Sequence, residues 1–372
     1  MKNLFYNSWP FLTLAILAFT IHLAFLSYPA QVVFDEVHFG KFVGAYFTGQ
    51  YYFDIHPPLG KLLIAGFAKL AGVNPVFDFE KIGEAIPIKT LFVLRFLPAF
   101  FGGLFVLFFS WLAYLLSRDK TAALIAGFLI LLDNAFLVQS KFILVDIFML
   151  TFEVLTLCFF LLSQRQKSFS AKWWSYLMLT AMFFGLTISI KWTGLATIGI
   201  IGVILLVKIF SEKLTNYLSS GQREPGQVPN GGRRLAEARQ RMACLPAKAC
   251  GLGRWQAGLP ENEEFARARA KKKTLEGLVG FLSILVIGFL VYLLLFYIHF
   301  KLLPLSGPGD AFMSQPFQQE LKYGRENVLE PLSWLQKFIE LNITMFTSSA
   351  NLTATHPFGS HWYAWPLNSK PI

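Results

Sequence analysis

The sequence predicts an all-α protein that crosses a membrane several times. Of its 372 residues, 55% are hydrophobic and only 15% are charged, so few polar side chains are available to cover a soluble domain. Long apolar runs recur along the chain, and a helix needs roughly 20 such residues to cross the hydrocarbon core. The predicted spans are seven in number and cover residues 10–28, 91–117, 121–138, 142–163, 174–190, 193–210 and 275–298.

The placement of positive charge predicts the orientation of these spans. The formal net charge is +11, and residues 221–273 hold 12 Lys and Arg against 5 Asp and Glu. The loops after the second, fourth and sixth spans are all basic, and they fall on one side of the membrane. Basic short loops are typical of the cytoplasmic side. We therefore expect the loop 29–90 and the region after residue 299 to face outward, and we interpret the basic charge as membrane-related, not as a nucleic-acid-binding surface.

Composition divides the chain into three predicted parts. Residues 1–210 form an N-terminal membrane module that includes the outer loop 29–90. Residues 211–273 form a basic segment, in which the part from 221 is rich in Gly, Arg, Ala and Pro; it is interpreted either as a disordered cytoplasmic insert or as a wrongly translated stretch. Residues 274–372 contribute the seventh span and a second outer region. No closing span follows, so we expect the chain to be a fragment.

The strongest candidate for chemistry is the stretch FDEVHFGKFVGAYFTGQYYFDIHPPLGK, residues 34–61. Its acidic pair, Asp35 and Glu36, follows the first span and is flanked by apolar residues. Apolar surroundings and a neighbouring like charge both raise the pKa of a carboxyl group, which suits a general base. The hypothesis is that Asp35 is the base of a membrane enzyme and that Glu36 assists it. A solvated acidic pair at the membrane surface is the simpler interpretation.

The same stretch contains a second polar cluster. Asp54 and His56 precede two prolines, whose restricted backbone can hold both side chains in a fixed geometry. An ordinary turn with incidental polar residues is the competing interpretation. Together with Asp35 and His38, these groups are also of types that bind zinc or another divalent cation, but their spacing matches no strong metal motif. A divalent cation is therefore kept as an alternative, and no metal ligand is assigned.

Three basic residues lie where predicted spans meet the outer face. Arg95 lies near the outer start of the second span, whereas Lys141 and Lys191 lie at the outward ends of later spans. Ionisable groups at such positions are costly in lipid and commonly face a protein interior or a wet cavity. We expect all three to approach the face that carries Asp35 and to bind a phosphate. Snorkelling of the long side chains to the interface is the alternative.

An aromatic motif near the C-terminus, HPFGSHWYAWP, offers further contacts. His356 and Trp362 in this motif can line a pocket for a sugar or a lipid headgroup. An aromatic belt at the membrane interface is the simpler explanation.

Taken together, the motifs resemble the protein O-mannosyltransferase family, which belongs to the GT-C class of membrane glycosyltransferases. The matching motifs occur in the family's order and cover most of the chain outside 211–273. They are FDEVHFGKF, YYFDIHPPLGKLL, LRFLPAFFGG, DNAFLVQSKFILVDIFMLTF, ISIKWTGL, SGPGDAFMSQPFQ and HPFGSHWYAWP.

This resemblance implies an activity and a set of roles. The family transfers mannose from a polyprenyl- or dolichyl-phosphate carrier to Ser or Thr hydroxyls of proteins, with inversion at the anomeric carbon. It implies Asp35 as the catalytic base, Glu36 as its partner, and Asp54 and Arg95 as further site residues. The segment between Gln318 and His356 is too short for the extra domain of eukaryotic members. We therefore expect a bacterial-type enzyme in the plasma membrane that uses a polyprenyl carrier.

Other classes of function remain alternatives at this point. A related enzyme could transfer sugar to a lipid or glycan acceptor. A transporter would line a continuous path with polar residues and break its helices near the midplane, whereas here the polar groups gather at one face. A non-catalytic membrane fragment is the third alternative.

Overall fold

The structure is a computed structural model, and it describes residues 9–221 and 263–351. The described residues are helical apart from loops, short 3-10 turns and two isolated β-bridges. They divide into two compact units, which are described separately. The first unit comprises residues 1–198 and 283–372, and the second comprises residues 199–282.

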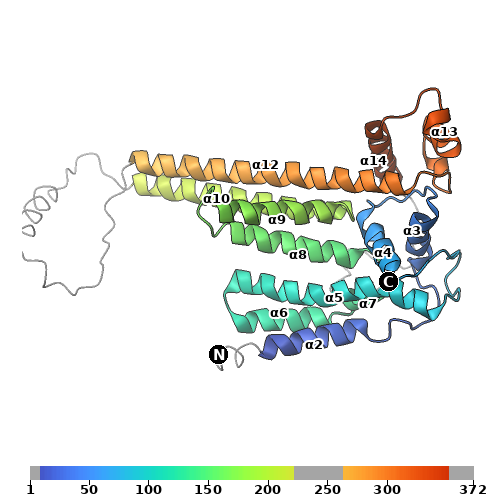
Figure 1. Cartoon of the computed structure of the whole chain (residues 1–372). Coiled ribbons are helices and arrows are strands. Elements are labelled where there is room, and N and C mark those ends of the chain that lie inside the picture. The colour runs from blue at the N-terminus through green and yellow to red at the C-terminus, as the bar shows by residue number, and fades with distance from the viewer. Residues whose placement is uncertain (1–8, 222–262, 352–372) are drawn as a thin grey trace, which may run out of the picture. The chain divides into compact units, whose positions relative to one another are not determined.

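Long helices packed side by side form the body of the first unit (Figure 1). Helix α5 packs against α2, α6 and α8, and α8 packs against α9. The bounds of these helices are α2 Trp9–Leu23, α5 Ile88–Ser117, α6 Lys120–Leu132, α7 Asn134–Lys141, α8 Asp146–Ser163 and α9 Ala171–Ile188.

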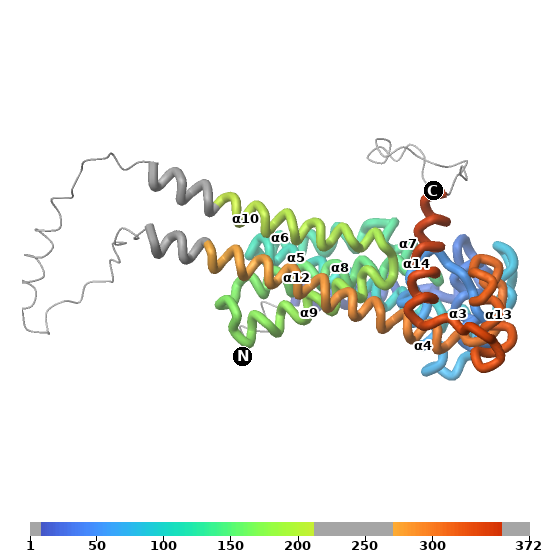
Figure 2. The backbone as a smooth tube through the Cα atoms, turned by 90° about the horizontal axis from the view of Figure 1, so that it is seen from above, coloured from blue at the N-terminus to red at the C-terminus, as the bar shows by residue number. Residues whose placement is uncertain are grey.

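Shorter elements gather at one end of this body, where Figure 2 shows α3, α4, α13 and α14 together. Two short 3-10 helices, η2 and η3, flank α13, and η1 lies between α9 and α10. The bounds of these elements are α3 Glu36–Thr48, α4 Leu59–Leu70, η1 Trp192–Gly194, η2 Asp310–Phe312, α13 Gln315–Tyr323, η3 Arg325–Asn327 and α14 Trp334–Ala350.

Two long helices have residues assigned to both units. They are α10, Leu195–Gly221, and α12, Glu263–Leu302. Within the first unit, α12 lies very close to α9, because a Cβ atom added at Gly288 would lie 2.6 Å from the Phe184 ring. Small residues that allow this close approach are typical of helix packing in membranes. Within the second unit, Gly202 of α10 faces Phe281 of α12.

Helices occur at all seven predicted spans, but not all are long and apolar enough to cross a membrane. Among the described residues, four qualify: α5, α8, residues 192–211 and residues 271–302. The pair α6 and α7 would make a fifth, although it bends by 59°. The apolar helix α2 has 15 residues and is shorter than a full span. The prediction of an all-α membrane protein is thus confirmed, with four or five clear spans.

The bend between α6 and α7 was not predicted, since residues 121–138 read as one apolar span. The physical cause is Asp133, whose carboxylate accepts a hydrogen bond of 2.8 Å from the Ala135 backbone N–H. This is the N-cap arrangement, in which a side chain satisfies a backbone donor of the first turn. Asp133 therefore ends α6 and starts α7 in a new direction.

Helix α3 is a second feature that was not predicted, and it lies within the predicted outer loop 29–90. The helix has ordinary end signals. Asp35 stands at its N-cap, Glu36 lies in its first turn, and Gly49 closes it with φ of 77°, a left-handed conformation that favours glycine. Helix α4 follows α3 along the chain and also lies within this predicted loop.

Candidate active site

Four helix starts in the first unit bring charged side chains to one place. Asp35 precedes α3, Asp54 and His56 precede α4, Asp146 begins α8, and Lys191 precedes η1. Electrostatic interactions connect Asp35 with Asp54, Asp146 and Lys191. We refer to these five residues as the Asp35 cluster. The predicted approach of Lys191 to Asp35 is therefore observed.

Asp35 is the member of the cluster with an available carboxylate. It occupies an N-cap position, yet its side chain makes no capping hydrogen bond. Partial burial raises the pKa of its carboxyl group above the usual 3.8, and the nearby Asp146 and Asp54 act in the same direction. His38 and Lys191 oppose this rise. A half-buried carboxylate with a raised pKa has the character of a general base.

Asp54 is held by a buried lysine that the sequence analysis did not select. Lys61 of α4 forms an ion pair with the Asp54 carboxylate, and its side chain is 1% exposed. Its Nζ also donates to the His56 carbonyl at 2.8 Å and lies 5.7 Å from the centre of the Phe42 ring. Burial lowers the pKa of Lys61, while Asp54 opposes this effect. The pair therefore fixes the turn that carries Asp54.

His56 is neutral in this environment. Burial lowers the pKa of its imidazole to about 4, although Asp54 favours the charged form. Its backbone N–H donates to Asp54 Oδ1 at 3.2 Å, which stabilises the turn before the two prolines. A neutral imidazole can accept or donate one hydrogen bond to a sugar hydroxyl.

Lys191 and Asp146 form the other side of the cluster. Their Nζ and Oδ1 atoms are 2.7 Å apart, and the two side chains remain 20% and 25% exposed. Asp146 was not among the site residues predicted from the sequence. Lys191 is thus a partly accessible cation beside Asp35, as the sequence analysis expected.

Glu36 and Arg95 form a separate, fully buried pair. Both side chains are 0% exposed. Arg95 Nε and Nη2 donate to the two Glu36 oxygens at 2.8 and 2.7 Å. Its remaining donors go to backbone carbonyls of Leu26, Pro29 and Gln31 at 2.9 to 3.1 Å.

All five N–H donors of Arg95 are therefore used within the protein, and no donor is left for a phosphate. Glu36 is equally occupied, since it also accepts from the backbone N–H groups of Val33 and Ile143, both at 2.9 Å. The structure places both residues in the framework behind Asp35. This differs from the expected contact of Arg95 with a phosphate.

The remaining predicted residues lie elsewhere. Lys141 ends α7, and its Nζ donates to the Ala24 carbonyl at 3.0 Å. His356 and Trp362 lie outside the described residues. In the parts of the chain that the structure describes, no group of three or more His, Cys, Asp or Glu side chains is placed to hold a metal ion.

A buried polar chain behind the cluster was not predicted. Tyr52 donates to the Tyr46 hydroxyl at 2.8 Å, and that oxygen lies 2.8 Å from His299 Nδ1 of α12. Burial raises the pKa of both tyrosines, so they remain protonated donors. No local sequence pattern indicates these hydrogen-bonded side chains. His299 is 253 residues away from Tyr46, and only the fold brings the two together.

Comparison with known proteins identifies the family. The family model described as dolichyl-phosphate-mannose-protein mannosyltransferase matches residues 12–238, more than half of the chain. The chain belongs to this family.

Two curated relatives show the extent of the similarity. Dolichyl-phosphate-mannose–protein mannosyltransferase 4 of Candida albicans is 31% identical over 310 residues, which are 82% of this chain and 35% of that protein. Protein O-mannosyltransferase 1 of Drosophila melanogaster is 30% identical over 324 residues, which are 86% of this chain and 30% of that protein. The chain thus spans about a third of the length of these relatives.

A solved structure has the same fold. The S. cerevisiae protein O-mannosyltransferase Pmt1-Pmt2 complex bound to the sugar donor matches with a TM-score of 0.66 and 26% identity. The match covers 86% of this chain and 37% of that chain. The GT-C type of membrane fold expected from the sequence is therefore confirmed.

Proposed function

We propose that the chain catalyses the transfer of mannose from a polyprenyl- or dolichyl-phosphate carrier to Ser or Thr hydroxyls of proteins. Membership of the mannosyltransferase family supports the reaction class. The observation that carries the proposal is the half-buried Asp35 carboxylate, which has a raised pKa and a cation, Lys191, beside it.

The proposed reaction is a single displacement that inverts the anomeric carbon. The acceptor hydroxyl oxygen attacks C1 of the mannosyl group, and the bond from C1 to the phosphate oxygen breaks. Asp35 takes the hydroxyl proton, and the carrier leaves as a lipid phosphate. This leaving group is a stable anion, so no acid is needed to protonate it. A positioned base and a nearby cation are therefore sufficient.

The geometry suggests distinct roles for the other predicted residues. Lys191 is the partly exposed cation of the Asp35 cluster, and it is the proposed contact for the developing phosphate charge. Asp54 and His56 are proposed to bind the sugar hydroxyls, held in place by Lys61. Glu36 and Arg95 are proposed to position Asp35 from behind and not to touch the donor.

The membrane arrangement is part of the proposal. We propose that α2 and α9 also cross the membrane, giving seven spans, and that the Asp35 cluster faces outward. The basic loops after the second, fourth and sixth spans support this orientation. A bacterial plasma membrane and a polyprenyl carrier remain predictions from the short segment between Gln318 and His356.

The test of this function is a transfer assay in isolated membranes that contain the full chain. Radiolabelled mannose is supplied either on polyprenyl phosphate or on a nucleotide, with a Ser/Thr-rich peptide as acceptor. We expect label on the peptide from the lipid-linked donor, and none on a matched peptide in which every Ser and Thr is Ala. Transfer from the nucleotide donor alone, or equal labelling of the Ala peptide, would contradict the proposal.

A further inference from the structure

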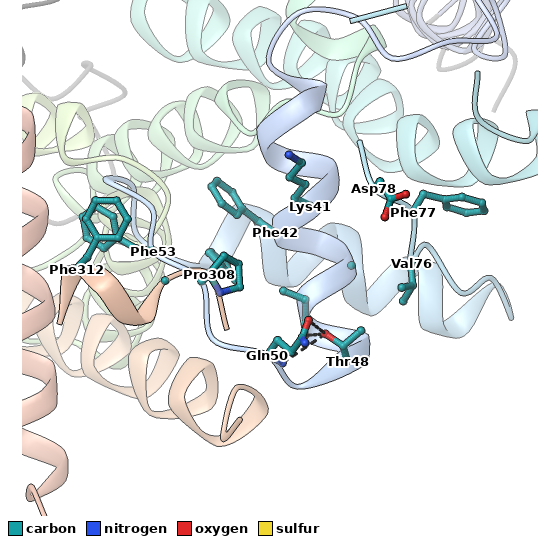
Figure 3. Close-up of a pocket in the computed structure, with 14 residues that line it drawn as sticks. Lys41, Phe42, Thr48, Gln50, Phe53, Val76, Phe77, Asp78, Pro308 and Phe312 are labelled. Atoms are coloured by element: carbon teal, nitrogen blue, oxygen red, sulfur yellow. Dashed lines mark hydrogen bonds between the residues drawn. The ribbon is translucent and has the colours of Figure 1, made fainter. Parts of the chain in front are cut away.

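A cavity lies within the first unit, and the residues directly before Asp54 of the Asp35 cluster form part of its lining. Its volume is about 400 Å³, and segments from α3, residues 50–53, residues 76–78 and residues 308–312 line it. Figure 3 shows how these segments surround it. Phe42 connects the two sites, because its ring lines the cavity and also lies 5.7 Å from Lys61 Nζ.

The motif SGPGDAFMSQPFQ forms one wall of this cavity. Tyr51 N–H donates to the Leu305 carbonyl at 2.8 Å, and Gly309 N–H donates to the Tyr51 carbonyl at 3.1 Å. The contact is so close that a Cβ atom at Gly309 would lie 2.3 Å from the Tyr52 carbonyl carbon. The backbone at this position therefore requires glycine.

This close contact places Phe312 against Phe53. Their ring centres are 4.3 Å apart and the rings are nearly parallel, with an interplanar angle of 20°. Figure 3 shows the pair at one side of the cavity. Such a stacked pair offers an apolar surface to a ligand.

Polar groups line the remaining walls. Lys41 extends from α3 and Asp78 lies on the opposite segment, while Thr48 and Gln50 lie near the base of α3 (Figure 3). No ion pair within the described parts of the chain uses Lys41 or Asp78. Both signs of charge, an amide and an aromatic pair in one cavity suit a polypeptide. A lipid tail would use only the aromatic surface.

The distance along α3 fits a polypeptide that also reaches Asp35. An α-helix rises about 1.5 Å per residue, so Phe42 lies roughly 10 Å and Thr48 roughly 20 Å along the helix from Asp35. An extended peptide covers about 3.4 Å per residue. A residue about three to six positions from a hydroxyl held at Asp35 would therefore reach the cavity.

We propose that this cavity binds the segment of the acceptor polypeptide that flanks the modified Ser or Thr, and that it contributes to acceptor specificity. The inference rests on the proposed function, since it concerns the acceptor of that reaction. It gives the SGPGDAF motif a role that the Asp35 cluster does not require.

Kinetic variants of the full chain test this proposal. Lys41→Glu and Phe312→Ala should each raise KM for a Ser/Thr peptide by about fivefold or more, with KM for the lipid-linked donor and kcat unchanged. The matched controls are Lys69→Glu and Tyr323→Ala, which alter exposed residues outside the cavity. A rise in KM for the lipid-linked donor alone would show that the cavity binds the lipid carrier. Unchanged KM values for both substrates would show that the cavity binds neither. Either result would overturn the proposal.

A binding measurement separates this proposal from the proposed function. A photoreactive residue replaces Ala45, which lines the cavity, or Ala71, an exposed control position. We expect capture of the Ser/Thr peptide at position 45 and not at position 71, with excess unlabelled peptide competing. Capture without any mannosyl transfer would contradict the proposed function and support peptide binding in the cavity. Transfer without capture would overturn the proposal that the cavity binds the peptide.

Discussion

At the scale of single residues, the proposed role of Asp35 as the base predicts how the activity depends on pH. A base must be deprotonated, so activity should fall as the pH falls through its pKa. Burial and the nearby carboxylates raise this pKa above 3.8, whereas Lys191 and His38 oppose the rise. The acid limb of the pH–rate profile should therefore lie above the usual range of an aspartate.

Replacing Lys191 should move this limb further upward. Lys191→Gln removes a cation that lowers the pKa of Asp35 and also leaves the Asp146 charge without its partner, and both changes raise the pKa. We therefore expect the acid limb of kcat/KM to shift to higher pH. Lys167→Gln, in the loop after α8, is the control and should leave the limb in place. A shift toward lower pH would show that Lys191 does not act on the base.

The sequence was sufficient to select Asp35, Asp54, His56 and Lys191, because charged groups among apolar residues are conspicuous. It could not reveal what each charge contacts. Arg95 read as a phosphate ligand, yet three backbone carbonyls and Glu36 use all of its donors. These carbonyls come from a loop about 65 residues earlier in the chain, and no local pattern indicates the contact.

At the scale of elements, the Glu36–Arg95 pair ties α3 to α5. Glu36 also accepts from Ile143, which brings the start of α8 into the same network. Asp35 is the neighbour of Glu36 in sequence, so this network fixes the start of α3 and with it the position of Asp35. A buried charge that loses its partner is strongly destabilising.

Breaking this pair should therefore cost both stability and activity. Arg95→Met leaves the Glu36 charge buried and unpaired, and we expect a loss of about 3 to 5 kcal/mol in the free energy of unfolding. Thermal unfolding in detergent measures the change. The double variant Glu36→Gln/Arg95→Met removes both charges and should recover part of the loss. A single variant as stable as the wild type would show that the pair contributes little to the framework.

The helices themselves were largely predictable, because long apolar runs indicate spans directly. The end signals of α3, namely Asp35, Glu36 and Gly49, are also present in the sequence, but the same polar residue types are typical of a catalytic loop. The bend at Asp133 was missed for another reason. A single capping aspartate inside an apolar run can change the direction of the helix and leave the hydrophobic pattern unchanged.

At the scale of the whole molecule, the chain holds the GT-C type of membrane body and the Asp35 cluster, and it spans about a third of the length of its curated relatives. The described residues place Asp35, Lys191 and a cavity lined by both apolar and charged side chains at the same end of the first unit. The central claim is that Asp35 accepts the proton during mannosyl transfer.

The measurement that tests this claim most directly compares wild type, Asp35→Asn and Asp119→Asn in the transfer assay with lipid-linked mannose. Asn keeps the shape of Asp but cannot act as a base, so Asp35→Asn should lower kcat by about 100-fold or more. Asp119 caps α6 away from the cluster, and its variant should retain activity close to the wild type. Equal rates for wild type and Asp35→Asn would contradict the role of Asp35 as the base. Glu36, Asp54 and His56 would then be the candidate bases.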